Sequence, residues 1–470
     1  MSPNTPVHAF TDDALGDLDA TGVAARIESG EVTAREVMEA SIARAEAVQG
    51  QLNGLACTDF DRALARSNRP AAGIFAGVPT AIKDNTDSAG LPTQQGSTAF
   101  TAVPAKADSD FAKQFLSTGA ISIGKTRLPE FGFSASTEYM TEEPVHNPWN
   151  PAYSSGASSG GAAALVAAGV LPIAHANDGG GSIRIPAAAC GLVGLKPTRG
   201  RTIADPADKS MPIRLIAQGA VTRTVRDTAR WMSAAESYYR NPRLAPVRLI
   251  EGPSSTRLRV GVITDSVTVT KTDDETRKSV EATAELLASL GHHVEDAALP
   301  VGPEFIDDFS IYWGFLSFAI STGGKQMLGP DFDKSATDNL TKGLYTLYRK
   351  NLVKTPRVLY RLRRLQQQYS AMFLKYDVVL SPALGHTTPE LGYLSPAQPF
   401  EELFDKLIAY TSFTPLNNIS GGPAISLPMH QTSNGLPLAS HFSADLGDER
   451  TLLELAFELE EAQPWRRIQD

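Results

Sequence analysis

Two serines in glycine-rich surroundings have the residue types that acyl transfer requires. Ser182 ends the run Asp-Gly-Gly-Gly-Ser at 178–182, and Ser158 lies in the stretch Gly-Ala-Ser-Ser-Gly-Gly at 156–161. Consecutive glycines are costly to order, and they are typical of places where the backbone points several N–H groups at a ligand. A row of N–H donors that ends at a hydroxyl indicates a nucleophile beside an oxyanion hole.

A lysine upstream could supply the base that such a serine needs. Lys83 ends the short apolar run Gly-Val-Pro-Thr-Ala-Ile-Lys at 77–83, which predicts a strand with the lysine at its end. Burial would lower the pKa of the amine, and a neutral amine can accept a proton from a hydroxyl. A lone lysine after a strand is usually a solvated surface residue, so this assignment depends on the serines downstream.

The chain resembles the amidase signature family of Ser–cisSer–Lys hydrolases in three separate motifs. These are GVPTAIKDN at 77–85, GASSGG at 156–161 and DGGGSIRIPAAACGLVGLKPT at 178–198. The resemblance continues in family order through FTPLNNISGGPAISLP at 413–428, GLP at 435–437 and PW at 464–465. It therefore covers nearly the whole chain, and it is nearest to the branch of 6-aminohexanoate-cyclic-dimer hydrolases and aryl acylamidases.

The resemblance implies a role for each residue of the central motifs. Ser182 would be the nucleophile, Ser158 the bridging serine on a cis peptide, and Lys83 the catalytic base. The oxyanion hole would consist of four backbone N–H groups, those of Gly179, Gly180, Gly181 and Ser182. Because backbone groups donate, the mechanism tolerates Gly179 where the family commonly has threonine.

Other residues of the same region are expected to support the site. Asp178 and Arg184 flank the glycine run, and an ion pair between them would hold its shape. Ser159 is expected to form hydrogen bonds within the site. Aromatic residues in the loop at 131–150 suit a substrate-pocket wall or a cover for the sheet, and the candidates are Phe131, Phe133 and Tyr139.

Two positions depart from the family pattern. Arg127 follows Gly-Lys-Thr where relatives usually have asparagine, and His441 stands where relatives often have glutamine. We expect His441 to be structural.

The fold that the resemblance implies is α/β, a mixed sheet with helices on both faces. We expect one domain over residues 1–470, with a core at about 65–235 and a variable, substrate-shaping region at about 255–410. Local patterns predict helices at 14–29 and 34–48, the second opened by a capping box of Thr33 and Glu36. They also predict a βαβ unit at 257–300 and a hairpin turn at Asn434-Gly435.

Two motifs offer alternatives with different chemistry. Residues 119–126 fit the P-loop pattern, but the expected strand lies inside the motif rather than before it, and Pro129 follows where a helix should run. Residues 156–160 fit the nucleophile elbow of a Ser-His-Asp esterase, with Ser158 as nucleophile. Its histidine would come late in the chain, and the candidates are His386, His430 and His441.

Composition and charge argue against several other classes of protein. The 470 residues carry a formal net charge of −9, which argues against nucleic acid as a partner, and the two cysteines suggest no disulfide framework. His175 near Asp178 is not enough for a metal site, and no cofactor is expected. No signal peptide or membrane span is evident, so we expect a cytoplasmic protein. We also expect a monomer or homodimer.

The resemblance implies hydrolysis of the C–N bond of small linear or aryl amides, with esters or carbamates as side substrates. An alternative within the family is an A-subunit-like protein of a tRNA-dependent amidotransferase, which would need protein and tRNA partners.

Overall fold

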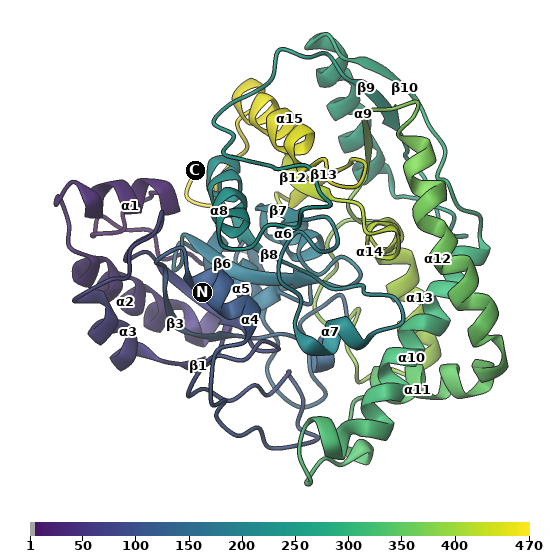
Figure 1. Ribbon diagram of the computed structural model, residues 1–470, viewed down its shortest axis with the longest axis horizontal. Helices are drawn as coiled ribbons and strands as arrows, with labels where there is room; N and C mark the ends of the chain where they lie inside the picture. Colours follow the sequence, from purple (N-terminus) through teal and green to yellow (C-terminus); the bar gives the residue numbers. More distant parts are fainter. Residues whose placement is uncertain (1–4) are drawn as a thin grey trace.

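An eight-stranded mixed sheet runs through the centre of the molecule (Figure 1), in a computed structural model that describes residues 5–470. Its strand order is β10-β9-β11-β13-β12-β7-β8-β6. Strand β9 is parallel to β10 and β11, and every other neighbouring pair is antiparallel. The strands are β6 (Ile173–Asp178), β7 (Val193–Lys196), β8 (Ala217–Thr222), β9 (Arg259–Val262), β10 (His293–Asp296), β11 (Val378–Pro382), β12 (Ala424–Gln431) and β13 (Pro437–Ser443).

A three-stranded sheet lies beside the β6 edge and brings Lys83 to the centre. Its order is β1-β3-β2, and its strands are β1 (Leu55–Thr58), β2 (Pro79–Lys83) and β3 (Ile121–Thr126). Side chains join β2 to β6, because Thr80 Oγ1 donates to the Ile173 carbonyl at 2.9 Å. A short hairpin of β4 (His146–Asn147) and β5 (Asn150–Ser154) stands apart from both sheets.

Helices cover both faces of the large sheet, because alternate strand residues pack into different cores. Ala220 packs in one apolar cluster with α8, α9 and α15, whereas Val221 packs in another with α5. The covering helices are α5 (Gly160–Ala167), α6 (Arg184–Cys190), α8 (Val225–Tyr238), α9 (Asp274–Ser289) and α15 (Glu449–Ala462). This is the α/β arrangement that the sequence predicted.

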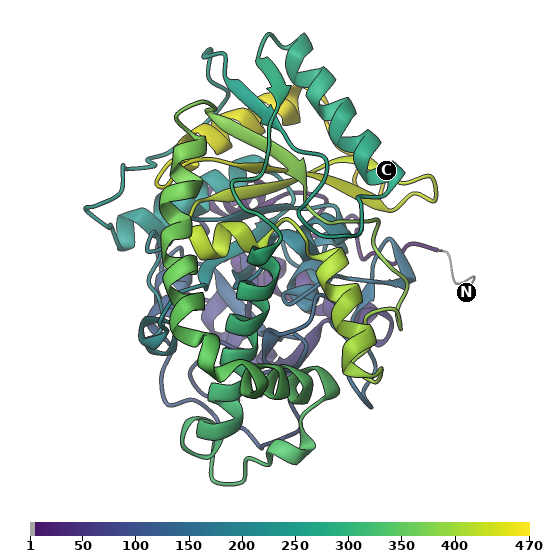
Figure 2. The same cartoon turned by 90° about the vertical axis from the view of Figure 1, so that its right-hand side faces the viewer.

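A layer of longer helices stands along one side of the molecule (Figure 2). Helices α10 and α12 flank each other, and α11 packs between α10 and α13. The helices of this region are α10 (Glu304–Met327), α11 (Asn339–Asn351), α12 (Thr355–Met372), α13 (Phe400–Tyr410) and α14 (Pro415–Ser420). Helices α10 to α13 belong to the region at about 255–410 that the sequence predicted to shape the substrate pocket, and α14 follows that region.

Shorter helices complete the structure. The α-helices are α1 (Ala20–Glu28), α2 (Ala34–Leu52), α3 (Phe60–Ser67), α4 (Asp110–Leu116) and α7 (Pro206–Ser210). The 3-10 helices are η1 (Glu130–Gly132), η2 (Lys334–Ala336) and η3 (Leu352–Lys354).

Several predicted elements are confirmed, but each of the first two helices has a boundary that differs from the prediction, and α2 ends at Leu52 rather than at residue 48. The capping box of Thr33 and Glu36 opens α2, β9 and β10 form the parallel pair of the βαβ unit, and β12 and β13 form the hairpin. The first helix begins at Ala20 rather than at residue 14, because the carboxylate of Asp19 accepts from the Gly22 N–H and so caps the helix there.

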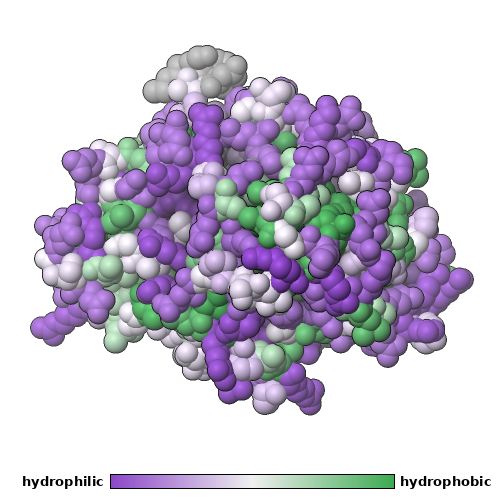
Figure 3. All heavy atoms as spheres, turned by 90° about the horizontal axis from the view of Figure 1, so that it is seen from above, coloured by the Kyte–Doolittle hydropathy of each residue, from purple (hydrophilic) through white to green (hydrophobic). Residues whose placement is uncertain are grey.

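The molecular surface is mixed in character. The face drawn in Figure 3 is mainly hydrophilic, with smaller hydrophobic areas between. Within residues 5–470, the helices are all too short or too polar to cross a bilayer. The same residues contain no group of three or more His, Cys, Asp and Glu side chains that could hold a metal ion.

Candidate active site

Lys83 lies at the end of β2 with its amine among hydroxyl and amide oxygens. The Nζ atom donates to Ser158 Oγ at 2.8 Å and to Ser159 Oγ at 2.9 Å. It also donates to the side-chain oxygen of Asn177 at 2.8 Å and to the Asn177 carbonyl at 3.3 Å. The structure therefore brings the predicted base into direct contact with both serines of the GASSGG motif.

Burial changes the protonation of this lysine. Lys83 is fully buried, and this desolvation lowers the pKa of its amine to about 7, against a smaller opposing effect of the Asp178 carboxylate. Near neutral pH a large share of the amines is therefore uncharged. A neutral amine has a lone pair, so the Ser158 hydroxyl can then donate to it.

The turn that carries Ser158 is held close to α6. The Ala157–Ser158 peptide bond is cis. Gly156 has a φ of +72°, and a Cβ at this position would lie 2.7 Å from Pro186 Cα. Glycine therefore allows the turn before α5 to approach the backbone of α6, the helix that follows Ser182.

A buried ion pair shapes the loop that carries Ser182. Arg184 Nε donates to Asp178 Oδ2 at 2.9 Å, and both side chains are fully buried. Asp178 also accepts from the Gly181 N–H at 2.7 Å and from the Ile183 N–H at 3.1 Å. Burial by itself would raise the pKa of Asp178, but the Arg184 guanidinium outweighs it, so the pKa lies below its usual range. The ion pair expected from the sequence is present.

Helix α14 supports this loop from the other side. Arg184 donates to the side-chain oxygens of Asn417 at 3.0 Å and of Asn418 at 2.8 Å. Asn418 Nδ2 returns a hydrogen bond to Asp178 Oδ1 at 2.9 Å, and Thr414 Oγ1 donates to the Gly180 carbonyl at 2.6 Å. The three polar side chains of α14 and its cap thus fix the glycine run from a segment more than 230 residues away in sequence.

The four predicted oxyanion donors differ in availability. The Gly181 N–H donates to Asp178, so it is already engaged. The N–H groups of Gly179, Gly180 and Ser182 make no hydrogen bond to any residue in the described range 5–470. The same holds for the Ser182 hydroxyl, which therefore is not joined to Ser158 by a hydrogen bond. Three donors and one hydroxyl are open to a ligand here.

Two predicted pocket aromatics flank a glycine that lies beside Ser158. A Cβ on Gly132 would lie 3.0 Å from Ser158 Oγ, so the segment 131–133 passes directly over that hydroxyl. Phe131 and Phe133 flank Gly132 and contact each other edge to face, with ring centroids 6.1 Å apart. They belong to an apolar cluster that includes Ile185 of α6. Both residues therefore adjoin, in sequence, the backbone that approaches Ser158.

Tyr139 lies in different surroundings. Its hydroxyl donates to the Leu128 carbonyl at 2.9 Å, and the Arg127 guanidinium lies 5.4 Å from its ring centroid. Both residues line a hollow of about 200 Å³ that also includes Cys57 and Asp84. Ser158 and Ser182 are not among the residues that line this hollow. Arg127, the first departure from the family pattern, also forms an ion pair with Glu142 at 2.7 Å.

His441, the second departure, is part of the buried network. Arg184 Nη1 donates to His441 Nε2 at 3.0 Å, and His441 Nδ1 lies 3.0 Å from Ser381 Oγ. Burial, together with the charge of Arg184, holds the pKa of His441 well below its usual value. The imidazole is therefore neutral, with Nε2 as the acceptor and the proton on Nδ1.

Sequence reasoning missed two polar residues of the site. Asn177 forms reciprocal amide hydrogen bonds with Asn85, at 2.9 and 3.2 Å, while it accepts from Lys83. Its position directly before Asp178 was the available signal. Glu130 accepts from Ser97 at 2.7 Å and from Thr341 at 2.7 Å, and so ties the segment over Ser158 to α11. Nothing local in the sequence indicates that pairing.

The alternative motifs are not supported by the geometry. The three candidate histidines of the esterase alternative have other partners: His386 bonds Thr387, His430 bonds Thr283, and His441 bonds Arg184 and Ser381. Residues 121–126 of the P-loop pattern form strand β3, where Lys125 is buried in an ion pair with Asp84 at 3.0 Å. A phosphate-binding lysine needs a loop before a helix.

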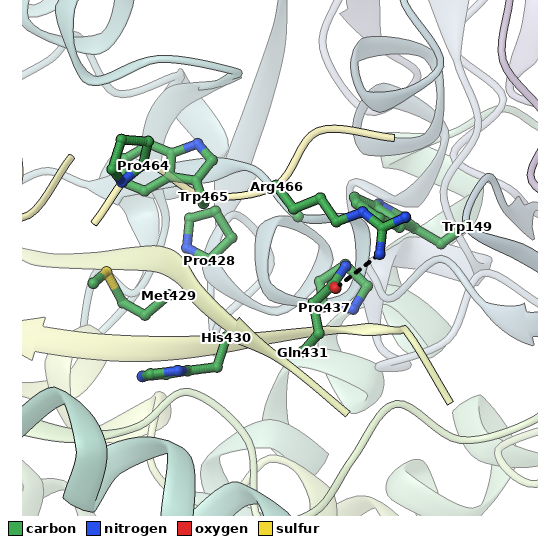
Figure 4. Close-up of a pocket in the computed structure, with 10 residues that line it drawn as sticks. Trp149, Pro428, Met429, His430, Gln431, Pro437, Pro464, Trp465 and Arg466 are labelled. Carbon is green, nitrogen blue, oxygen red and sulfur yellow. Dashed lines mark hydrogen bonds between the residues drawn. The ribbon is translucent and has the colours of Figure 1, made fainter. Parts of the chain in front are cut away.

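A separate hollow of about 230 Å³ lies near the C-terminus. It is lined by Trp149 and Trp465, by prolines of three segments, and by polar side chains of β12 (Figure 4). Arg466 Nη1 donates there to Gln431 Oε1 at 3.3 Å. None of its lining residues belongs to the cluster around Lys83, so we do not assign chemistry to it.

Comparison with known families and proteins gives a consistent result. The Amidase family model matches residues 36–453. The chain is 48% identical to the amidase AmiC of Mycobacterium leprae, over 98% of this chain and 99% of that protein. It is 33% identical to the 6-aminohexanoate-cyclic-dimer hydrolase of Paenarthrobacter ureafaciens, over 95% of each chain.

A solved structure has the same fold. The structure of 6-aminohexanoate cyclic dimer hydrolase superposes with a TM-score of 0.88 at 30% identity, over 98% of this chain and 99% of the other. The match spans the large sheet, the three-stranded sheet and the outer helices together.

Proposed function

The chain belongs to the amidase family and is an amide hydrolase, and from that premise we propose that it cleaves small linear or aryl amides through a covalent acyl-enzyme on Ser182. One observation carries the proposal. The fully buried amine of Lys83, with its pKa lowered to about 7, lies 2.8 Å from Ser158 Oγ. A neutral lysine in contact with a serine is a proton acceptor for acyl transfer.

The first half of the reaction forms the acyl-enzyme. Ser182 Oγ attacks the amide carbonyl carbon, while Ser158 takes the Ser182 proton and passes its own to Lys83 Nζ. The negative charge that develops on the carbonyl oxygen is stabilised by the free N–H groups of the loop, those of Gly179, Gly180 and Ser182. The C–N bond then breaks, and the proton returns from Lys83 through Ser158 to the leaving amine.

The second half releases the acid. Water attacks the acyl carbon, and its proton follows the same route through Ser158 to Lys83. The tetrahedral intermediate collapses, Ser182 leaves, and it regains a proton from Ser158. Lys83 returns its proton to Ser158, so the amine and the two serine hydroxyl groups are then in their starting states.

The surroundings favour small, mostly apolar acyl groups. Phe131 and Phe133 supply an apolar wall beside Ser158, and a Cβ on Gly180 would lie 3.5 Å from the Phe309 ring of α10. The resemblance to 6-aminohexanoate-cyclic-dimer hydrolase points to an amide with an aliphatic acyl chain. Esters and carbamates are expected side substrates because they share the acyl-enzyme step. We expect a cytoplasmic protein that works as a monomer or homodimer, without nucleic acid.

The test is hydrolysis of a chromogenic panel by matched variants. The panel contains p-nitroanilides of increasing acyl length, p-nitrophenyl esters and a carbamate. The variants are Ser182→Ala, Ser158→Ala, Lys83→Ala and the control Ser155→Ala, whose buried hydroxyl bonds only backbone carbonyls. The three catalytic variants should each lose at least about 10²–10⁴ in kcat/KM, and the control should lose far less.

Two results would count against the proposal. Activity that survives Ser182→Ala but disappears in Ser158→Ala would make Ser158 the nucleophile. Amide hydrolysis that appears only when a partner protein and tRNA are supplied would favour the amidotransferase-like alternative.

A further inference from the structure

Four basic side chains surround a hollow that lies outside the cluster around Lys83. The hollow has a volume of about 200 Å³, and its polar lining includes Arg199, Lys209, Arg214 and Arg363. No aspartate or glutamate is among its lining residues. In a chain with a formal net charge of −9, such a group of like charges is unexpected.

These cations are not neutralised by ion pairs. In the described part of the chain, residues 5–470, none of the four forms a salt bridge. Arg214 and Lys209 make no side-chain hydrogen bond there, and Arg363 makes one long contact of 3.5 Å to the Pro212 carbonyl. Like charges held together without a counter-charge repel each other, so an anion in the hollow would be stabilised.

Arg199 is a partly buried lining residue of the hollow, and hydrogen bonds hold it in place. Its Nη2 donates to the carbonyls of Asn418 at 2.7 Å and Ile419 at 2.6 Å, while its buried Nε has no partner. Its Nη1 makes no hydrogen bond within residues 5–470 either. Burial, and next the nearby charge of Arg214, lowers the pKa of Arg199 to about 10, so the guanidinium remains charged near neutral pH. A rigid guanidinium with free N–H groups is suited to oxyanions.

The walls are held in place by specific contacts. Tyr312 of α10 donates to the Ile213 carbonyl at 2.6 Å and accepts from the Ile213 N–H at 2.9 Å, which fixes the segment that carries Arg214. Arg363 projects from α12, whose buried residue Leu362 lines the same hollow. The four cations thus come from three separate segments that the fold brings together.

We propose that this hollow is a binding site for a small anion that carries two or more phosphate or carboxylate groups. Several charges are required, because the cations are distributed over Arg199, the segment 209–214 and α12. The site is distinct from the catalytic cluster, since Lys83, Ser158 and Ser182 do not line it.

The experiment is isothermal titration calorimetry at constant ionic strength, with inorganic pyrophosphate and citrate as the two probes. No amide is present, so the result does not depend on whether the chain hydrolyses one. The test variant is Arg214→Gln/Arg363→Gln, and both side chains are exposed, so folding should be retained. The control, Lys350→Gln/Arg357→Gln, removes the same charge from exposed positions that do not line the hollow.

We expect saturable one-site binding of at least one probe to the wild-type protein and to the control. The test variant should bind at least about tenfold more weakly, because it loses two charge-assisted contacts. Preference between pyrophosphate and citrate distinguishes phosphate from carboxylate ligands. The proposal is overturned if neither probe saturates, if the test variant binds as tightly as wild type, or if both variants weaken equally. The last result would indicate diffuse attraction to the surface.

Discussion

The buried amine of Lys83 determines how the proposed reaction should respond to pH. Its pKa is lowered to about 7, and only the neutral form can accept the proton that Ser158 passes on. We therefore expect kcat/KM to rise with pH through an apparent pKa of about 7 and then to level off. The measurement is a pH–rate profile with a p-nitroanilide whose own groups do not titrate in this range. A profile that is flat from pH 6 to 9 would contradict the role of Lys83.

His441 contacts Arg184, so we expect it to position the glycine loop rather than to act on the substrate. His441→Ala removes the Nε2 acceptor of the Arg184 guanidinium, which holds Asp178 and the glycine loop. We expect kcat to fall about tenfold while KM changes little. The substitution should move the N–H donors of the glycine loop more than it moves the apolar wall of Phe131 and Phe133. His441→Gln restores an acceptor, so it should recover most of the lost kcat. Equal losses in both variants, or a loss in KM alone, would contradict this positioning role.

Residues in contiguous motifs could be identified from the sequence, whereas those that depend on the fold could not. The Asp178–Arg184 ion pair was predictable because both residues flank one glycine run. Asn418 and Glu130 reach the site from distant segments, and only the folded structure shows what they contact. Tyr139, grouped with the pocket aromatics by its loop, instead lies against Arg127 and Leu128.

The capping box at the start of helix α2 allows a test of local stability that is separate from catalysis. The exposed Thr33 hydroxyl accepts from the Glu36 N–H at 3.1 Å, and Glu36 accepts from the Thr33 N–H at 2.7 Å. Thr33→Ala should lower the free energy of unfolding by about 1 kcal/mol. Denaturant unfolding measures this change, and kcat on the p-nitroanilide should stay the same. Thr33→Ser, which keeps the hydroxyl, is the control and should cost much less.

Elements with strong periodicity were predicted well, but boundaries depended on tertiary contacts. The hairpin of β12 and β13 was predicted from Asn434-Gly435. Strand β6 continues through polar residues to Asp178, an extent that periodicity does not indicate. Such polar residues are typical of a loop. They are accommodated in a buried strand because His175 pairs with Gln218 and Asn177 with Lys83.

At the scale of the whole molecule, one buried arginine joins distant parts of the chain. Arg201 forms ion pairs with Glu449 at 2.6 Å and with Glu236 at 3.2 Å, and it donates to the Gly447 carbonyl at 3.0 Å. Arg201→Met leaves the carboxylate of the fully buried Glu449 without its partner. We expect a loss of about 3–5 kcal/mol in the free energy of unfolding, measured by denaturant titration.

The control for this prediction is an exposed ion pair. Arg35 and Glu39 on α2 lie 2.8 Å apart with about half of each side chain exposed, so Arg35→Met should cost about 0–1 kcal/mol. Similar losses in the two variants would contradict the importance of burial at Arg201.

The fold class could be predicted because several motifs occur in family order along nearly the whole chain. The order of the strands could not, since β11, β13 and β12 insert between β9 and β7. Their placement depends on pairs that are far apart in sequence, Val260 with Val378 and Lys196 with Ala424. The basic hollow near α12 was equally inaccessible, because Arg199, Arg214 and Arg363 are scattered in sequence.

The most direct test of the central claim is to locate the acyl group on the protein. Wild-type protein is mixed with a p-nitrophenyl ester, quenched in acid before the second half-reaction is complete, digested and examined by mass spectrometry. The account predicts one acyl group on the peptide that contains Ser182, and none in Ser182→Ala. An acyl group on Ser158, or rapid amide hydrolysis with unmodified protein at every quench time, would contradict it.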